Sequence, residues 1–243
     1  MATISENLQQ LQERLTNACK AADRPVQSVT LLAVSKTFPS DDVRAAHAAG
    51  QRRFGENYVQ EALDKMQALA DLRPSLEWHL IGPLQSNKTR AVAEAFDWVH
   101  SVERLKIAQR LSEQRPPHLP PLAVCLQVNI SGEASKSGCS VDELPALARA
   151  VATLPRLALR GLMAIPEPAG DFEAQRRPHR ALAALRDRLN AELGLQMDTL
   201  SMGMSADLEA AIAEGSTLVR VGTAIFGGRP RAGAAGASAA GVG

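Results

Sequence analysis

The chain alternates between short apolar runs and longer segments whose apolar residues recur at helical spacing. In the first segment Ile4, Leu8, Leu11 and Leu15 fall on one face, which predicts an amphipathic helix at the start of the chain. Residues 28–35 then form a run rich in Val and Leu, which is typical of a buried strand. The two kinds of segment continue to alternate to the end of the apolar pattern.

This alternation predicts a barrel. Further strands are expected at 52–55, 76–81, 97–101, 122–130, 158–163, 199–202 and 217–221. Helices are expected between them at 39–49, 58–72, 86–95, 102–114, 141–154, 172–193 and 206–214. Alternating strands and helices indicate a parallel sheet, and eight such units in about 250 residues favour a single closed (β/α)8 TIM-type barrel with an extra N-terminal helix. An open doubly wound sheet is the alternative, but no GxGxxG follows the first strand.

Composition narrows the class of protein. The chain has 243 residues, 45% of them hydrophobic, which suffices for one barrel over residues 1–229; we expect the Ala/Gly-rich tail at 230–243 to be disordered. With 27 basic and 26 acidic residues the net charge is +1, which argues against nucleic-acid binding. No apolar run approaches the roughly 20 residues of a membrane helix, and no apolar signal core is seen. Three cysteines without a CxxC pair argue against disulfides or structural zinc, so we expect a cytoplasmic protein.

Lys36 is the first candidate for chemistry, because it directly follows the first predicted strand. Burial at the carboxyl end of a strand lowers the pKa of a lysine. A neutral amine can then attack an aldehyde and form a Schiff base. The alternative is a structural one, in which the ammonium extends from the strand end into solvent.

Small residues dominate the turns after the seventh and eighth predicted strands. The sequence MGMSADLEAAI places Ser205 before a helix, and VGTAIFGG places Gly222 and Thr223 after a strand. Backbone N–H groups beside small side chains can approach an anion, and these two loops commonly form a phosphate site in (β/α)8 barrels. Alternatively, Ser205 only caps the helix and Gly222 forms a tight turn. Together with Lys36, the turns suggest pyridoxal phosphate or a phosphosugar as the ligand.

Arg220 distinguishes these two ligands. It lies two residues before Gly222, so we expect it to point into the same mouth of the barrel. A permanently charged guanidinium beside a pyridine nitrogen would keep that nitrogen unprotonated and weaken the ring as an electron sink. The alternative is an arginine in a surface ion pair.

Five stretches of sequence resemble a known family: LLAVSKTFPSDDVRAAHAAG, RRFGENYVQEALDK, EWHLIGPLQSNK, LRGLMAIP and LSMGMSADLEAAIAEGSTLVRVGTAIFGGR. They extend from Leu31 to Arg229 and resemble the pyridoxal phosphate homeostasis protein family, also called the proline synthetase co-transcribed homologue family. The resemblance implies a single barrel similar to the N-terminal domain of alanine racemase. After Arg229 the family usually continues with an aromatic residue, whereas here Pro230 and the Ala/Gly tail follow.

The resemblance also implies roles for individual residues. Lys36 would hold pyridoxal phosphate as a Schiff base, and Ser205, Gly222 and Thr223 would bind its phosphate. Arg220 resembles the arginine that faces the ring nitrogen in the racemase. Residues of other family-like motifs complete the expected pocket: Asn57, His79, Ser201 and Gly203.

A racemase needs an acid and a base on opposite faces of the ring. Lys36 could serve one face, but the racemase takes its second base, a tyrosine, from another domain, and this chain has a single tyrosine, Tyr58. We therefore expect a non-catalytic monomer that binds, buffers and delivers the cofactor in vitamin B6 and amino and keto acid homeostasis, with apo-enzymes as recipients. The alternatives are a pyridoxal phosphate-dependent amino acid racemase or lyase, and a Schiff-base barrel acting on a phosphosugar.

Overall fold

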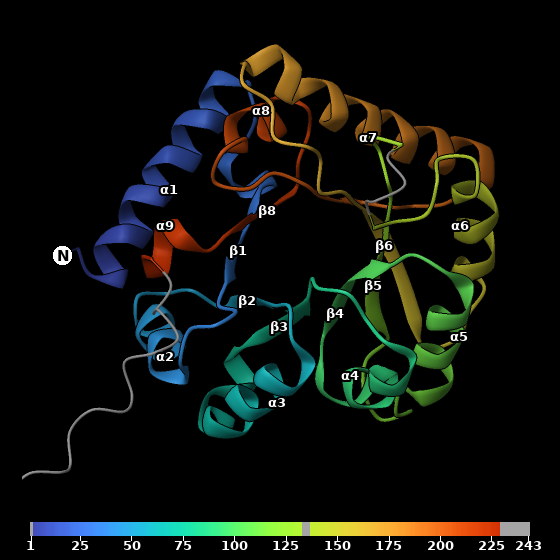
Figure 1. Ribbon diagram of the computed structural model, residues 1–243, viewed down its shortest axis with the longest axis horizontal. Helices are drawn as coiled ribbons and strands as arrows, with labels where there is room; N and C mark the ends of the chain where they lie inside the picture. The colour runs from blue at the N-terminus through green and yellow to red at the C-terminus, as the bar shows by residue number, and fades with distance from the viewer. Residues whose placement is uncertain (1, 133–136, 229–243) are drawn as a thin grey trace, which may run out of the picture.

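The structure, a computed structural model, describes residues 2–132 and 137–228. Eight parallel strands form a closed barrel in which each strand pairs with the next along the chain and the last pairs with the first. Helices surround this barrel (Figure 1). The predicted (β/α)8 barrel is confirmed, and the open doubly wound sheet is not formed. The tail predicted at 230–243 lies outside the described residues.

The elements follow the predicted order. The strands are β1 (Thr30–Val34), β2 (Arg53–Glu56), β3 (Glu77–Leu80), β4 (Trp98–Val102), β5 (Leu122–Gln127), β6 (Leu157–Met163), β7 (Thr199–Ser201) and β8 (Leu218–Val221). The α-helices are α1 (Ile4–Ala21), α2 (Ser40–Ala48), α3 (Val59–Ala68), α4 (Thr89–Ala95), α5 (Leu105–Gln114), α6 (Leu144–Ala152), α7 (Phe172–Leu193), α8 (Leu208–Ala213) and α9 (Thr223–Phe226). The 3-10 helices are η1 (Val26–Ser28), η2 (Ala70–Ser75) and η3 (Ser86–Lys88).

Some predicted boundaries differ from those of the structure. The helix expected at 58–72 ends at Ala68 and gives way to η2, which contains Pro74; a proline disfavours helical backbone in the residue before it. The helix expected from residue 102 begins at Leu105, because Val102 still pairs with Leu126 in the barrel. The four-residue helix α9 is too short to produce a periodic pattern, and it was not predicted.

The N-terminal helix α1 is added to the barrel rather than being part of its repeat. Thr3 and Glu6 form a capping box that starts the helix. Its buried face, which includes Leu8, Leu11 and Leu15, packs against the side of the barrel where α8 and α9 lie (Figure 1). The two ends of the described chain therefore meet on one side of the molecule.

Apolar side chains form two clusters. The larger one joins the strands to the surrounding helices. The smaller one consists of Leu32, Val34, Ile81 and Leu218 and is separate from it. Because Val34 and Ile81 line a cavity at the carboxyl ends of the strands and Leu218 lines one at the amino ends, the smaller cluster lies between the two cavities. Within the described residues, no helix combines the length and apolarity needed to cross a membrane.

Candidate functional site

A cavity of about 320 Å³ opens at the carboxyl ends of the strands, where the ends of parallel strands meet. Its volume is within the range of small-molecule sites. Predicted site residues gather in it: Lys36, Asn57, Ser205, Arg220, Gly222 and Thr223. Apolar and small residues that the sequence analysis did not single out complete the wall: Val34, Phe38, Ile81, Ile165, Met204 and Ala206. Residues of this second group carry no reactive group, so only the fold could show their position.

Lys36 lies in the turn that follows β1 and is half-buried at the cavity wall. The next residue, Thr37, has a φ of 68°, in the left-handed region that a β-branched residue rarely adopts. The carboxylate of Glu61 accepts a hydrogen bond from the Thr37 N–H at 2.5 Å, which holds this conformation. Backbone strain of this kind is typical of functional sites, where the surrounding structure maintains it.

A buried cluster of charged side chains stabilises the same turn. The Lys65 ammonium donates to the Ser35 carbonyl oxygen at 2.6 Å, to Glu56 Oε1 at 2.7 Å and to Glu61 Oε1 at 2.6 Å. The Lys65 side chain is 7% exposed and that of Glu56 is 0% exposed. Burial raises the pKa of the Glu56 carboxyl, and the charge of Lys65 opposes this effect. The cluster therefore ties the end of β1, the end of β2 and α3 together around the turn that presents Lys36.

The loop between β7 and α8 presents Ser205 to the cavity. Asp207, not Ser205, occupies the N-cap position of α8, and its carboxylate accepts a hydrogen bond from the Met204 N–H at 2.7 Å. Gly203 has a φ of 94°, and a Cβ atom there would lie 2.5 Å from the Cβ of Ala211. Gly203 therefore allows the loop to pack on α8, and the structure does not place it in the cavity wall.

The loop between β8 and α9 depends on close approach to the first strand. A Cβ atom on Gly222 would lie 3.0 Å from the carbonyl oxygen of Val34, so a larger residue would press on β1. Gly222 is the N-cap of α9, and Thr223 is its first residue. This packing brings Gly222 and Thr223 to the same mouth as Lys36.

Helix α1 braces both loops from outside the barrel. Arg14 Nη2 donates to the carbonyl oxygen of Ser205 at 2.9 Å, and the same guanidinium forms an ion pair with Glu209 of α8 at 2.6 Å. Asn7 Nδ2 donates to the carbonyl oxygen of Ile225 in α9 at 2.8 Å. The added helix thus reaches the backbone of the loop before α8 and that of α9, which directly follows Gly222.

Arg220 is buried, with 4% of its surface exposed, and it bonds to neutral oxygens rather than to a carboxylate. Its Nη1 donates to Ser201 Oγ at 2.8 Å, and its Nη2 donates to the Ala164 carbonyl oxygen at 2.9 Å. Burial lowers the pKa of the guanidinium to about 10, so it remains charged at neutral pH. Ser201, which the sequence predicts in the site, contacts Arg220 but is not among the residues that line the cavity.

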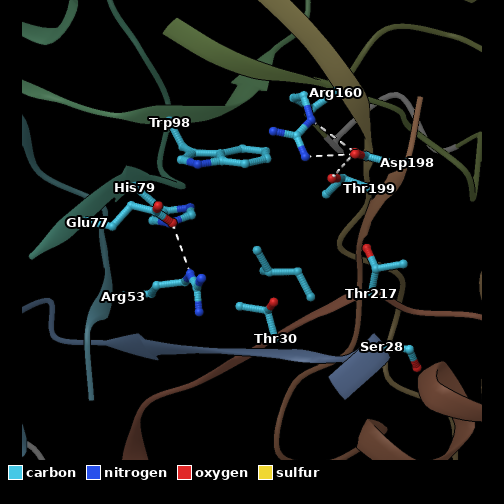
Figure 2. Close-up of a pocket in the computed structure, with 11 residues that line it drawn as sticks. Ser28, Thr30, Arg53, Glu77, His79, Trp98, Arg160, Asp198, Thr199 and Thr217 are labelled. Atoms are coloured by element: carbon cyan, nitrogen blue, oxygen red, sulfur yellow. Dashed lines mark hydrogen bonds and ion pairs between the residues drawn. The ribbon is translucent and has the colours of Figure 1, made fainter. Parts of the chain in front are cut away.

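The structure places His79 elsewhere, in a second cavity of about 380 Å³ at the amino ends of the strands (Figure 2). Its ring stacks on Trp98 with centroids 5.3 Å apart, and its Nε2 hydrogen-bonds Glu77 Oε1 at 2.8 Å. The other charged side chains of this cavity are paired with one another, Arg53 with Glu77 and Arg160 with Asp198. His79 therefore does not contact the cavity that contains Lys36.

The Asn57 side chain offers a hydrogen-bonding group to a ligand. Asn57 follows β2 and lines the carboxyl-end cavity, and its Oδ1 atom is buried with no hydrogen-bond partner among the described residues. A buried polar atom without a partner is energetically unfavourable unless a ligand or water satisfies it. The cavity thus combines an amine, a buried cation, an amide acceptor and two loops of small residues.

Fold and site together define a barrel of the type found in alanine racemase, and residues 6–230 match the family described as the alanine racemase N-terminal domain. The Pseudomonas aeruginosa pyridoxal phosphate homeostasis protein is 65% identical, over 94% of this chain and 97% of that protein. The protein of that name from Escherichia coli K12 is 54% identical, over 94% and 98%. The chain therefore belongs to the pyridoxal phosphate homeostasis protein family, as its motifs predicted.

Solved structures agree with this assignment. PipY of Synechococcus elongatus PCC7942, solved with pyridoxal phosphate bound, superposes with a TM-score of 0.81 and 38% identity, covering 93% of this chain and 100% of PipY. The D-threonine aldolase of Filomicrobium marinum superposes with a TM-score of 0.71 but only 16% identity, covering 91% and 59% of the two chains. The second comparison supports the fold alone.

Proposed function

We propose that this protein binds pyridoxal 5'-phosphate as a Schiff base on Lys36 and holds, buffers and delivers it within the cell, without catalytic turnover. The observation that supports the proposal most directly is the cavity at the carboxyl ends of the strands. It brings Lys36 from the first βα unit into one wall with Ser205, Gly222 and Thr223 from the last two. The names of the relatives and the cofactor bound to PipY point in the same direction.

Each cavity residue has a part that suits this ligand. In its neutral form, the Nζ of Lys36 would form a C=N bond with the aldehyde carbon of the cofactor, and the aldehyde oxygen would leave as water. Ser205, Gly222 and Thr223 hold the phosphate through hydroxyl and backbone N–H groups. Asn57 supplies a buried acceptor that is unsatisfied among the described residues, which makes the cavity fit a polar ligand.

Arg220 would influence the electronic state of the bound ring. When bound, the pyridoxal ring supplies electron-withdrawing power that depends on protonation of its nitrogen. The Arg220 guanidinium is charged and donates to two neutral oxygens, so placed against the ring nitrogen it would disfavour protonation there. The bound ring is then a weaker electron sink; because the racemase holds its cofactor beside a similar arginine, Arg220 alone does not distinguish binding from racemisation.

The position of the single tyrosine fits a non-catalytic role. Tyr58 is the N-cap of α3, is 56% exposed, and is not among the residues that line the carboxyl-end cavity. A racemase requires a second base opposite Lys36. We therefore propose a part in vitamin B6 and amino and keto acid homeostasis, exerted by supplying the cofactor to apo-enzymes.

The covalent link is tested with the whole chain. Protein reconstituted with pyridoxal 5'-phosphate is expected to absorb in the visible range, and borohydride reduction should fix a pyridoxyl group on the peptide that contains Lys36. Lys36→Ala should abolish the visible band, whereas Lys20→Ala, a change on the exposed side of α1, should leave it intact. A pyridoxyl group on another residue, or a colourless wild-type protein, would contradict the proposal.

A separate measurement addresses turnover. The loaded protein is incubated with L-amino acids in deuterium oxide, and exchange of the α-proton is followed by NMR. We expect no exchange above the rate given by free pyridoxal 5'-phosphate. Sustained exchange or racemisation by the wild-type protein would instead support the racemase or lyase.

A further inference from the structure

A continuous row of hydrogen-bonded side chains crosses the barrel interior and joins the two cavities. Arg220 Nη1 donates to Ser201 Oγ at 2.8 Å, and Ser201 Oγ lies 2.7 Å from His100 Nδ1. His100 Nε2 lies 2.8 Å from His79 Nδ1, and His79 Nε2 lies 2.8 Å from Glu77 Oε1. We call these five residues the interior chain; they come from β8, β7, β4 and β3.

The interior chain is shielded from water along most of its length. Ser201, His100 and His79 are 0% exposed, and Arg220 is 4% exposed. Glu77 is the most exposed of the five, at 38% of its side chain, and at the amino-end cavity it also pairs with Arg53 at 3.1 Å (Figure 2). Buried polar groups of this kind need complete hydrogen bonding, because each unmade bond is costly in a low-dielectric interior.

The carboxylate end fixes the direction of every hydrogen bond when both imidazoles are neutral. A guanidinium can only donate, and an ionised carboxylate can only accept. A neutral His79 that donates from Nε2 to Glu77 accepts at Nδ1, so His100 donates to it from Nε2. The Nδ1 of His100 then accepts from the Ser201 hydroxyl, whose oxygen accepts from Arg220. In this arrangement both imidazoles have the same Nε2–H tautomer.

The surroundings of the two imidazoles favour the neutral form. Burial lowers the pKa of His79, although Glu77 and Asp97 oppose the shift; burial lowers that of His100 further, and the neighbouring His79 and Arg220 act in the same sense. At the amino-end terminus of the interior chain, the hydrogen bond from His79 lowers the pKa of Glu77. The Glu77 carboxylate therefore stays ionised and accepts the hydrogen bond from His79.

We propose that His100 is a positioning residue of the carboxyl-end site, acting on Arg220 through Ser201. His100 Nδ1 accepts a hydrogen bond from the Ser201 hydroxyl. The lone pairs of Ser201 Oγ are then directed away from His100, and one of them accepts the hydrogen bond from the guanidinium. His79 and Glu77 hold His100 in the tautomer that this arrangement needs. The inference extends the proposed function, in which Arg220 lies against the ring nitrogen of the cofactor.

The consequence concerns the orientation of one guanidinium. Arg220 is held at two points, Ser201 and the Ala164 carbonyl oxygen, and its remaining N–H groups can serve the cavity. Without an acceptor at His100, the Ser201 hydroxyl can turn its hydrogen toward Arg220 and that point of attachment is lost. The guanidinium would then have a single fixed bond and a looser position beside the ligand.

The first test needs no cofactor. Nitrogen-15 NMR of the apo-protein reports the tautomer of each histidine from the shifts of its two ring nitrogens. At pH 7.5 we expect His79 and His100 to be neutral and protonated at Nε2. An Nδ1–H tautomer or a charged ring at His100 would overturn the proposal.

The second test uses variants loaded with pyridoxal 5'-phosphate. His100→Leu removes the acceptor, and we expect a dissociation constant about tenfold higher together with a displaced visible absorbance band. His100→Asn keeps an acceptor, since its Oδ1 can occupy the place of Nδ1, and should recover most of the wild-type affinity and spectrum. His47→Leu, a change at a half-buried histidine of α2 bonded to Ser75, is the control and should match the wild type.

The outcomes separate the possible failures. Wild-type affinity and an unchanged band in folded His100→Leu would overturn the positioning role. If His100→Leu does not fold, Ser201→Ala, which removes the same contact to Arg220, should show the same weaker binding and band displacement. Wild-type protein that takes up no pyridoxal 5'-phosphate would overturn the proposed function, while the tautomer measurement would still decide the interior chain.

Discussion

Ser205 supplies the side-chain hydroxyl on which the proposed phosphate-binding part of the site depends. It was ambiguous in the sequence, because a serine before a helix often serves as the N-cap. In the structure Asp207 takes that position and Arg14 holds the Ser205 carbonyl, so the hydroxyl of Ser205 is not used to start α8. The side chain is half-buried at the cavity wall and available to a ligand.

Ser205→Ala should weaken binding of pyridoxal 5'-phosphate. The loss of one hydrogen bond to a charged phosphate corresponds to about 1.5–3 kcal/mol, or a dissociation constant higher by about tenfold to a hundredfold. Absorbance titration of the apo-protein measures this. Ser28→Ala, at the amino-end cavity, should leave the affinity unchanged. Equal affinities for Ser205→Ala and the wild type would show that the hydroxyl does not bind the phosphate.

Helix α1 is an addition to the repeating barrel, and its contacts explain why the added helix matters for the site. Its polar side chains reach the backbone of the loops after β7 and β8, through Arg14 to Ser205 and through Asn7 to Ile225. A loop that is bonded at its backbone loses less entropy when it orders around a ligand. The helix therefore stabilises the loops in the shape that is proposed to bind an anion.

Arg14→Met should speed the release of pyridoxal 5'-phosphate severalfold, because the Ser205 loop loses its outer support. Its effect on the free energy of unfolding should be small, about 1 kcal/mol or less, since the ion pair with Glu209 is partly exposed. Stopped-flow absorbance during transfer of the cofactor to an excess of acceptor measures the release rate. Arg44→Met, which removes an exposed ion pair with Asp71 away from the loops, is the matched control. Identical release rates for the two variants would show that Arg14 does not stabilise the Ser205 loop.

At the scale of the whole molecule, the interior chain places polar side chains inside the barrel, where many barrels have only apolar ones. His79 and His100 are buried and neutral, and burial holds the pKa of each below its ordinary value of 6.5. In the unfolded chain both would titrate normally. Below pH 6.5 the unfolded state therefore binds more protons than the folded state. The free energy of unfolding must then decrease as the pH decreases.

We expect urea denaturation to show stability decreasing from pH 7 to pH 5.5, by up to about 1.4 kcal/mol per pH unit for each buried histidine. Glu77, whose pKa is lowered, adds a further loss as the pH falls through 4.5. Glu56 acts in the opposite direction because its pKa is raised. His100→Asn should show a shallower slope than the wild type between pH 5.5 and 7. A flat profile in the wild type would contradict the burial of neutral imidazoles.

The sequence was sufficient to predict the barrel and to predict that residues following the strand ends lie close together. Lys36, Ser205 and Gly222 stand directly beside predicted strands, and the carboxyl ends of parallel strands meet at one mouth, so order along the chain predicted their proximity. Element boundaries were less accurate where a strand continued its pairing beyond the apolar run, as at Val102.

The interior chain could not be predicted in the same way. His79 stood in a family-like motif, but which mouth it faces depends on its height in β3 and on its stacking with Trp98. His100 contacts Ser201, a residue from a strand distant in sequence, through the barrel interior. The only signal in the sequence was the polar pair His100 and Ser101 within β4, which does not reveal a partner.

The pairing of β1 with β8 has a consequence for synthesis of the protein. Lys36 follows the first strand, but the loops that complete its cavity follow β7 and β8, the last two strands of the barrel. A nascent chain that still lacks β7 and β8 therefore presents the amine without the loops proposed to bind the phosphate. Under the proposed function, native capture of the vitamin B6 aldehyde must wait until β8 has been made, so shorter chains should not compete with the folded protein for it.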